Sequence, residues 1–185
     1  MLANLITILR IALLPIMIYL LSQNNFSSSL AAIILLFLVV LSDILDGYIA
    51  RRKHEVTRFG SFLDPVSDIL IVYSLLIFFT LKNSLLLIPL IVFLLRDFSV
   101  NFHRFIAAKN DLEIGPDPYK KRGNLLQYLL VFFLGLENLW AYSALSDSFY
   151  MLATQGLVFL FLLVAVIYSI ASALYYFVKV FKNTI

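Results

Sequence analysis

Long apolar stretches separated by short polar segments run through the sequence from one end to the other. Runs of about 17 to 27 apolar residues are long enough to cross a lipid bilayer as α-helices. Because six such runs can be separated, the pattern predicts an all-α integral membrane protein with six transmembrane helices. The helices are expected at about 5–21, 29–50, 60–81, 84–107, 123–145 and 151–178.

The composition agrees with a membrane location. Of the 185 residues, 62% are hydrophobic and 14% are charged, which is far too apolar for a soluble domain of this size. No polar linker divides the chain, so we expect one membrane-embedded domain over 1–185. The net charge is only +3, and we expect no nucleic-acid partner. The absence of cysteine excludes thiol chemistry.

Positively charged residues gather on one side of the predicted arrangement. If the N-terminus is cytosolic, the polar loops at 51–58 and 109–122 and the C-terminus are cytosolic as well. Ten lysines and arginines then face the cytosol and only Lys82 faces the other side, as the positive-inside rule requires. The ten are Arg51, Arg52, Lys53, Arg58, Lys109, Lys120, Lys121, Arg122, Lys179 and Lys182. We expect a multi-pass protein of a bacterial-type inner or plasma membrane, with both termini in the cytosol.

Four aspartates fall within two of the predicted helices, where ionisable side chains are expensive and usually mark function. Asp43 and Asp46 are three residues apart, and Asp64 and Asp68 are four apart. Either spacing puts both carboxylates of a pair on one helix face. Asp46 lies about five residues before the cytosolic loop, or roughly 8 Å along a helix, and Asp64 is similarly close to it. Both pairs are therefore expected at one depth near the cytosolic face, where the active site would lie.

Carboxylates at one depth can share metal ions. Oxygen ligands favour Mg²⁺, Mn²⁺ or Ca²⁺ over zinc, and two such ions about 3.5–4 Å apart suit displacement at phosphorus. One aspartate would take the proton of an attacking hydroxyl. Gly47 and Gly60 remove side chains beside the site, and Arg51 at its rim suits a phosphate. A lipid substrate would explain why such a site is built into the bilayer.

The segment from Asp43 to Asp68 resembles the signature of the CDP-alcohol phosphatidyltransferase family. Its pattern, Asp-x2-Asp-Gly-x2-Ala-Arg-x8-Gly-x3-Asp-x3-Asp, matches every signature position. The resemblance implies that an alcohol attacks the β-phosphorus of a CDP-linked donor, usually CDP-diacylglycerol, and that CMP leaves. It also implies a homodimer in the bilayer and two divalent cations, Mg²⁺ or Mn²⁺.

The resemblance also implies roles for individual residues. It assigns one metal to Asp43, Asp46 and Asp64, a second metal to Asp43, Asp64 and Asp68, and the role of general base to Asp68. The donor-binding positions are matched by Gly47, Ala50, Arg51, Thr57 and Gly60, and the N-terminal nucleotide-contacting element by Asn4 and Thr7. Thr57 also fits a simple helix cap.

A second group of residues resembles the phosphatidylglycerophosphate synthase branch of the family, whose acceptor is the phosphorylated alcohol glycerol 3-phosphate. It comprises Arg96 with Asp97, Arg104 with 105–108, Lys121 and Gln127. Three positions depart from the branch, which usually carries Glu at Asp97 and a second Lys and a Thr at Gly123 and Asn124. Inositol phosphate, serine and phosphatidylglycerol therefore stay open as acceptors.

Arg96 falls inside a predicted membrane helix, where an unpaired guanidinium would be expensive. A substrate phosphate is one possible partner, and a helix-packing ion pair is the alternative. Asp97 is expected to be a poor partner, because adjacent residues point about 100° apart on a helix. Lys121 with Arg104 would complete a cationic acceptor pocket, whereas Lys120 and Arg122 are expected to set topology.

A small cation transporter is the alternative from another functional class. Its intramembrane carboxylates should be spread through the depth of the membrane, whereas these four are expected near one face. The two glycines and Arg51 would have no role in such a pathway. The sequence therefore favours an enzyme, and metal-dependent release of CMP would separate the two.

Overall fold

Seven helical segments make up the computed structural model, which describes the backbone of 2–53, 58–109, 118–143 and 149–184. Side-chain environments are described within 7–42, 66–103, 119–143 and 149–178, and at 106. The helices are α1 Leu2–Ser22, α2 Phe26–Lys53, α3 Arg58–Lys82, the short 3₁₀ helix η1 Ser84–Leu86, α4 Leu87–Lys109, α5 Pro118–Ala141 and α6 Phe149–Thr184. No strand occurs in these ranges, which confirms the all-α prediction.

The start of α5 differs from the prediction. The helix begins at Pro118 rather than at 123, so Lys120, Lys121 and Arg122 belong to its first turns and the prediction of a loop there was wrong. Proline suits the first position of a helix, because its fixed φ is already helical and its missing N–H would have no helical partner. The end of the last helix differs too, since α6 continues to Thr184 rather than ending at 178.

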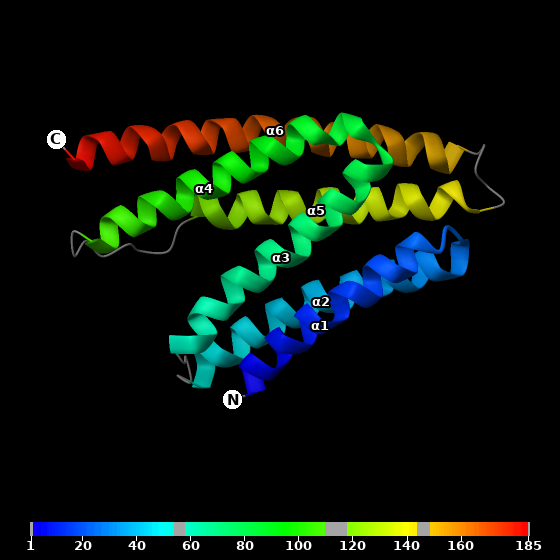
Figure 1. Ribbon diagram of the computed structural model, residues 1–185, viewed down its shortest axis with the longest axis horizontal. Helices are drawn as coiled ribbons and strands as arrows, with labels where there is room; N and C mark the ends of the chain where they lie inside the picture. The colour runs from blue at the N-terminus through cyan, green and yellow to red at the C-terminus, as the bar shows by residue number, and fades with distance from the viewer. Residues whose placement is uncertain (1, 54–57, 110–117, 144–148, 185) are drawn as a thin grey trace.

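Figure 1 shows the helices running back and forth between two ends of the molecule. The helix α1 packs along α2 and against α3, while α6 packs along both α4 and α5. At one end lie the turn between α1 and α2, the turn between α3 and α4, and the last turn of α5 (Figure 1). At the other end lie the start of α1, the end of α2, the start of α3 and the start of α5. The helix ends that carry the aspartates and the basic residues thus share one end.

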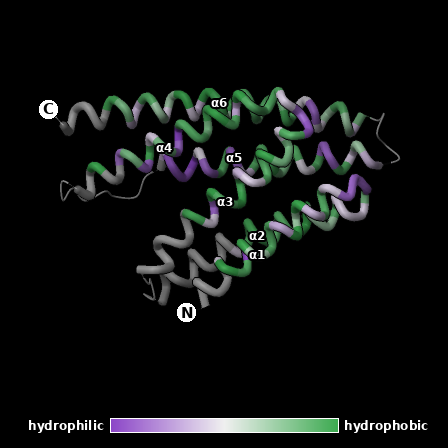
Figure 2. Tube along the Cα trace, viewed as in Figure 1, coloured by the Kyte–Doolittle hydropathy of each residue, from purple (hydrophilic) through white to green (hydrophobic). Residues whose placement is uncertain are grey.

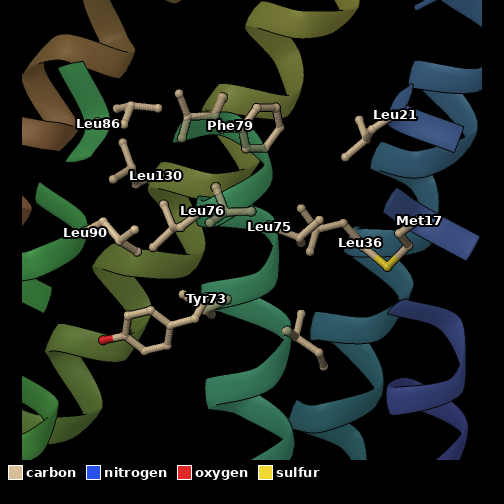
Figure 3. Packing of buried hydrophobic residues seen from close by; sticks show 14 of the residues in the cluster. Met17, Leu21, Leu36, Tyr73, Leu75, Leu76, Phe79, Leu86, Leu90 and Leu130 are labelled. Carbon is tan, nitrogen blue, oxygen red and sulfur yellow. The ribbon is translucent and has the colours of Figure 1, made fainter. Parts of the chain in front are cut away.

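The core is built from aliphatic and aromatic side chains at the contacts between helices (Figure 3). It includes Met17 of α1, Leu36 of α2, Leu75 and Leu76 of α3, and Leu130 of α5, each at most 4% exposed. Burial of such side chains stabilises the packing by about 1.5–3 kcal/mol each in water. Within lipid, tight packing contributes instead through van der Waals contact.

Hydrophobic residues predominate along much of the described chain (Figure 2), and many large hydrophobic side chains are exposed on the helices. Three described segments are long and apolar enough to span a membrane, namely Ser84–His103, Tyr119–Ala141 and Phe149–Val178. Thr7–Ser22 and Phe26–Ser42 are shorter apolar helices. An apolar surface of this extent suits contact with lipid rather than water. The chain is therefore a membrane protein, and the count of six transmembrane helices stays a prediction.

A polar cluster joins the helices at the end opposite the aspartates. The Lys82 ammonium donates to Oδ1 of Asn24 at 2.9 Å and to Oδ1 of Asn138 at 2.8 Å. The Tyr142 hydroxyl donates to the same oxygen of Asn24 at 2.8 Å, and Asn138 Nδ2 donates to Ser29 Oγ at 3.0 Å. The lysine predicted on the non-cytosolic side thus links α3 to α5 and to the turn after α1.

Candidate active site

Asp68 lies on α3 where this helix faces both α1 and α5. The Tyr128 hydroxyl of α5 donates a hydrogen bond of 3.0 Å to Oδ1 of Asp68. Nη1 of the buried Arg10 on α1 lies 4.0 Å from the same oxygen. The Asp68 side chain is 22% exposed, so its carboxylate is oriented by neighbours and is still accessible from outside the packed core.

A cavity of about 130 Å³ opens beside Asp68, between α3, α4 and α5. Its lining residues are Asp68, Ile69, Asp97, Val100, Asn101, Lys120 and Asn124. The wall therefore carries two carboxylates, one ammonium and two amides on an apolar base. Such a small cavity with convergent polar groups has the character of a ligand site. It is much smaller than the cavities of about 300–1,000 Å³ that hold drug-sized ligands.

Arg96 of α4 lies directly behind this wall and is completely buried. Its Nη1 forms an ion pair with the Asp97 carboxylate and donates to Oδ1 of Asn124 at 3.0 Å. Its Nη2 donates to the backbone carbonyls of Tyr119 and Lys120, at 3.1 and 3.0 Å. The expectation that Asp97 is a poor partner was wrong, because the long arginine side chain reaches the carboxylate despite the angle between adjacent helical positions.

Gly123 makes room for the guanidinium. A Cβ atom at position 123 would lie 2.0 Å from Nη2 of Arg96 and 2.4 Å from its Cζ. Any larger residue would therefore displace Arg96 from its position against α5. The Asp97 carboxylate has a second partner on α3, since the Tyr73 hydroxyl donates to its Oδ2 at 2.7 Å. Both oxygens of Asp97 thus have protein partners.

The structure brings some of the residues predicted from the sequence to this cavity. Asp68 lines it, and Arg96 stands behind it. Lys121 is exposed and absent from the cavity lining, whereas its neighbour Lys120 lines it. Thr7 is fully buried on α1, one turn before Arg10.

The other predicted residues lie outside the described side chains. Thr57 falls outside the described residues altogether. For a further nine residues on α1 to α4, the structure describes the helical backbone and not the side chains. They are Asn4, Asp43, Asp46, Gly47, Ala50, Arg51, Gly60, Asp64 and Arg104.

Four residues at the site were not assigned to it from the sequence. They are Tyr73, Asn101, Lys120 and Tyr128. The only available signal was for Lys120, because a helix that begins at Pro118 points adjacent lysines in different directions. The two tyrosines and Asn101 are identified only by the packing of α3, α4 and α5.

The donors present suit hard divalent cations. Within the described side chains no group of three or more His, Cys, Asp or Glu could hold a metal ion. Whether the protein suits a metal is therefore judged from the chemistry of its donor residues. The aspartates are carried by the last turns of α2 and the first turns of α3, which lie at the same end of the molecule (Figure 1). Asp68, the described member, keeps an accessible carboxylate. Carboxylates in this number fit Mg²⁺ or Mn²⁺.

Comparison with known proteins gives one consistent result. The family model described as CDP-alcohol phosphatidyltransferase matches residues 1–178. A protein of Aquifex aeolicus is 32% identical over 139 residues, covering 74% of this chain and 76% of the relative. A protein of Bacillus subtilis is 33% identical over 190 residues, covering 96% and 94%. Both relatives are named CDP-diacylglycerol--glycerol-3-phosphate 3-phosphatidyltransferase. This chain therefore belongs to the CDP-alcohol phosphatidyltransferase family, as the segment from Asp43 to Asp68 indicated.

Proposed function

We propose that this protein transfers a phosphatidyl group from CDP-diacylglycerol to glycerol 3-phosphate and releases CMP. Its family membership and the names of its relatives support this reaction. The observation that carries the proposal is the small cavity in which Asp68 faces Lys120 and two asparagines. A general base, a cation and neutral hydrogen-bonding groups are what a small phosphorylated alcohol needs.

Asp68 acts as the general base. A hydroxyl group bound in the cavity would lie against its carboxylate, and a base must be within hydrogen-bond reach of the proton it removes. Tyr128 and Arg10 keep the carboxylate in place. The alkoxide that forms attacks the β-phosphorus of the donor, the phosphorus–oxygen bond to CMP breaks, and CMP leaves with the bonding electrons.

The acceptor occupies the cavity with its phosphate toward the start of α5. Lys120 supplies a cation there, and Arg104 and Lys121 are the further cations that the sequence assigns to the acceptor. Asn101 and Asn124 offer amide groups to the remaining hydroxyl. The volume of about 130 Å³ favours glycerol 3-phosphate over the larger inositol phosphate or a second phospholipid.

The donor binds across the aspartates. Two divalent cations, Mg²⁺ or Mn²⁺, held by Asp43, Asp46, Asp64 and Asp68, would neutralise the diphosphate and stabilise the leaving group. The nucleotide and diphosphate would contact Asn4, Thr7, Gly47, Ala50, Arg51, Thr57 and Gly60. The acyl chains stay in the bilayer beside the apolar faces of the helices.

The active site opens to the cytosol. The helix ends that carry the aspartates and the basic residues share one end of the molecule (Figure 1). The positive-inside rule assigns that end to the cytosol. Six transmembrane helices, with both termini in the cytosol, and a homodimer complete the proposal.

The test is release of CMP from CDP-diacylglycerol by the purified protein with Mg²⁺, with each acceptor offered separately. We expect release with glycerol 3-phosphate and none when the metal is chelated. Release only with serine, inositol phosphate or phosphatidylglycerol would contradict the proposed acceptor and leave the transfer chemistry in place. No release with any acceptor, by protein shown to be folded, would overturn the proposed reaction and favour a different donor or a cation transporter.

A further inference from the structure

Arg96 makes most of its hydrogen bonds to one short stretch of α5. Its guanidinium donates to the carbonyl oxygens of Tyr119 and Lys120 and to the side chain of Asn124. All three acceptors belong to the first two turns of the helix. The remaining bond goes to Asp97, the next residue on α4. The guanidinium therefore joins α4 to the start of α5.

Three of the residues that Arg96 holds also line the cavity beside Asp68. They are Asp97, Lys120 and Asn124. A shift of the first turns of α5 would move Lys120 and Asn124 together, because both sit on those turns and both are bonded to the same guanidinium. The shape and charge of the cavity on this side thus depend on where Arg96 lies.

The position of Arg96 depends in turn on Gly123. The space beside this glycine is filled by the guanidinium, with Nη2 2.0 Å and Cζ 2.4 Å from where a Cβ would be. The contact is with the charged head of the side chain, and Arg96 is completely buried. It therefore has little room to move aside without losing its bonds to α5.

We propose that Arg96 and Gly123 form a positioning pair that seats the start of α5 against α4, so that Lys120 receives the anionic group of the acceptor. This inference rests on the proposed function. Arg96 is then a positioning residue that acts through Lys120. The rival is direct contact between Arg96 and the acceptor phosphate, which its complete burial and its bonds to four protein oxygens oppose.

The first part of the test compares Lys120 with Arg122 by CMP release in detergent, with KM measured separately for glycerol 3-phosphate and for CDP-diacylglycerol. Lys120→Gln should raise KM for glycerol 3-phosphate about tenfold or more, because a charge-assisted hydrogen bond to phosphate is lost. KM for CDP-diacylglycerol should stay the same. Arg122→Gln is the matched control, since Arg122 is an exposed cation on the same turns of α5 and does not line the cavity. A larger effect at Arg122 than at Lys120 would overturn the inference.

The second part asks whether Gly123 acts through Lys120. Gly123→Ala should raise KM for glycerol 3-phosphate by a similar factor. In the double variant, Lys120→Gln should raise KM for glycerol 3-phosphate less than twofold above that of Gly123→Ala, because the lysine has already lost its position. Additive effects of the two substitutions would show that they act independently and would overturn the inference.

Asn124→Ala provides a second route if Gly123→Ala fails to fold, because it removes one bond of Arg96 without a steric clash. Combined with Lys120→Gln, it should show the same loss of additivity in KM for glycerol 3-phosphate. Additive effects of Asn124→Ala and Lys120→Gln would overturn the inference. The wild-type protein separates the two proposals. A wild type that releases no CMP with glycerol 3-phosphate overturns the proposed function and the inference with it. An active wild type with a normal Lys120→Gln variant overturns the inference alone.

Discussion

The hydroxyl of Tyr128 on α5 donates a hydrogen bond of 3.0 Å to the carboxylate of Asp68 on α3. These residues are far apart in the sequence, and of the two Asp68 lines the cavity. The carboxylate of an aspartate can rotate about the bonds of its side chain. The hydrogen bond from Tyr128 restricts this rotation by holding Oδ1 of Asp68. The carboxylate is thereby held beside the cavity in which the acceptor would bind.

Tyr128→Phe should therefore lower kcat with little effect on KM for CDP-diacylglycerol. The substitution keeps the ring and removes only the hydroxyl, so the packing of α5 should be preserved. Loss of a hydrogen bond to a charged group costs about 1.5–3 kcal/mol, which corresponds to roughly a tenfold or larger fall in kcat. Steady-state kinetics with glycerol 3-phosphate gives the answer, and a wild-type kcat would show that the hydroxyl has no part in holding the base.

Arg96 should contribute strongly to the stability of the fold. Arg96→Met would leave the Asp97 carboxylate without its buried ion-pair partner, and breaking such a pair costs about 3–5 kcal/mol in water. Arg122→Met is the control, because Arg122 is exposed on the same turns of α5. Thermal unfolding in detergent should show a much lower midpoint for the first variant only. Equal midpoints would contradict the buried ion pair.

Lys82 should matter for stability and not for catalysis. It donates to Asn24 and Asn138 at the end of the molecule opposite the aspartates. Lys82→Met should lower the unfolding midpoint by an amount that corresponds to about 1–3 kcal/mol, because the two amides lose a charged donor. The kcat at a temperature where the variant is folded should equal that of the wild type. A selective loss of kcat would mean that the two ends of the molecule are coupled.

The absence of cysteine makes the predicted orientation easy to test. Single cysteines can be placed at Lys121 on α5 and at Leu85 in η1, both exposed and at opposite ends of the molecule. A membrane-impermeant maleimide should label Leu85→Cys in intact cells and Lys121→Cys only after permeabilisation. The reverse pattern would contradict a cytosolic active site.

The helices and the acidic segment could be predicted from the sequence, because the length of each apolar run and the spacing of the aspartates are local properties. The start of α5 could not, since the basic residues Lys120 to Arg122 break the apolar pattern although Pro118 already begins the helix. The sequence favoured Lys121 over Lys120 because Lys121 matches the family branch. Which of two adjacent lysines faces the cavity depends on the rotation of α5 against α4, which is a tertiary property.

The three positions that depart from the family branch lie together in the structure. Asp97, Gly123 and Asn124 all surround the guanidinium of Arg96. Considered one position at a time, each departure weakened the assignment of the acceptor. Considered together, they form one buried cluster in which a carboxylate and an amide accept hydrogen bonds and a glycine leaves room. Residues that contact one guanidinium from two helices cannot be grouped without knowledge of the packing.

Whether Asp68 takes the proton of the acceptor in the cavity can be tested by comparing two aspartate variants with the wild type. CMP release with glycerol 3-phosphate and binding of CDP-diacylglycerol are measured for the wild type, for Asp68→Asn and for Asp97→Asn. Asp97 lines the same cavity but is bonded to Arg96 and Tyr73. We expect Asp68→Asn to lose about 10²–10⁴-fold in turnover and to keep donor binding, while Asp97→Asn keeps measurable turnover. Wild-type turnover in Asp68→Asn would show that Asp68 is not the general base.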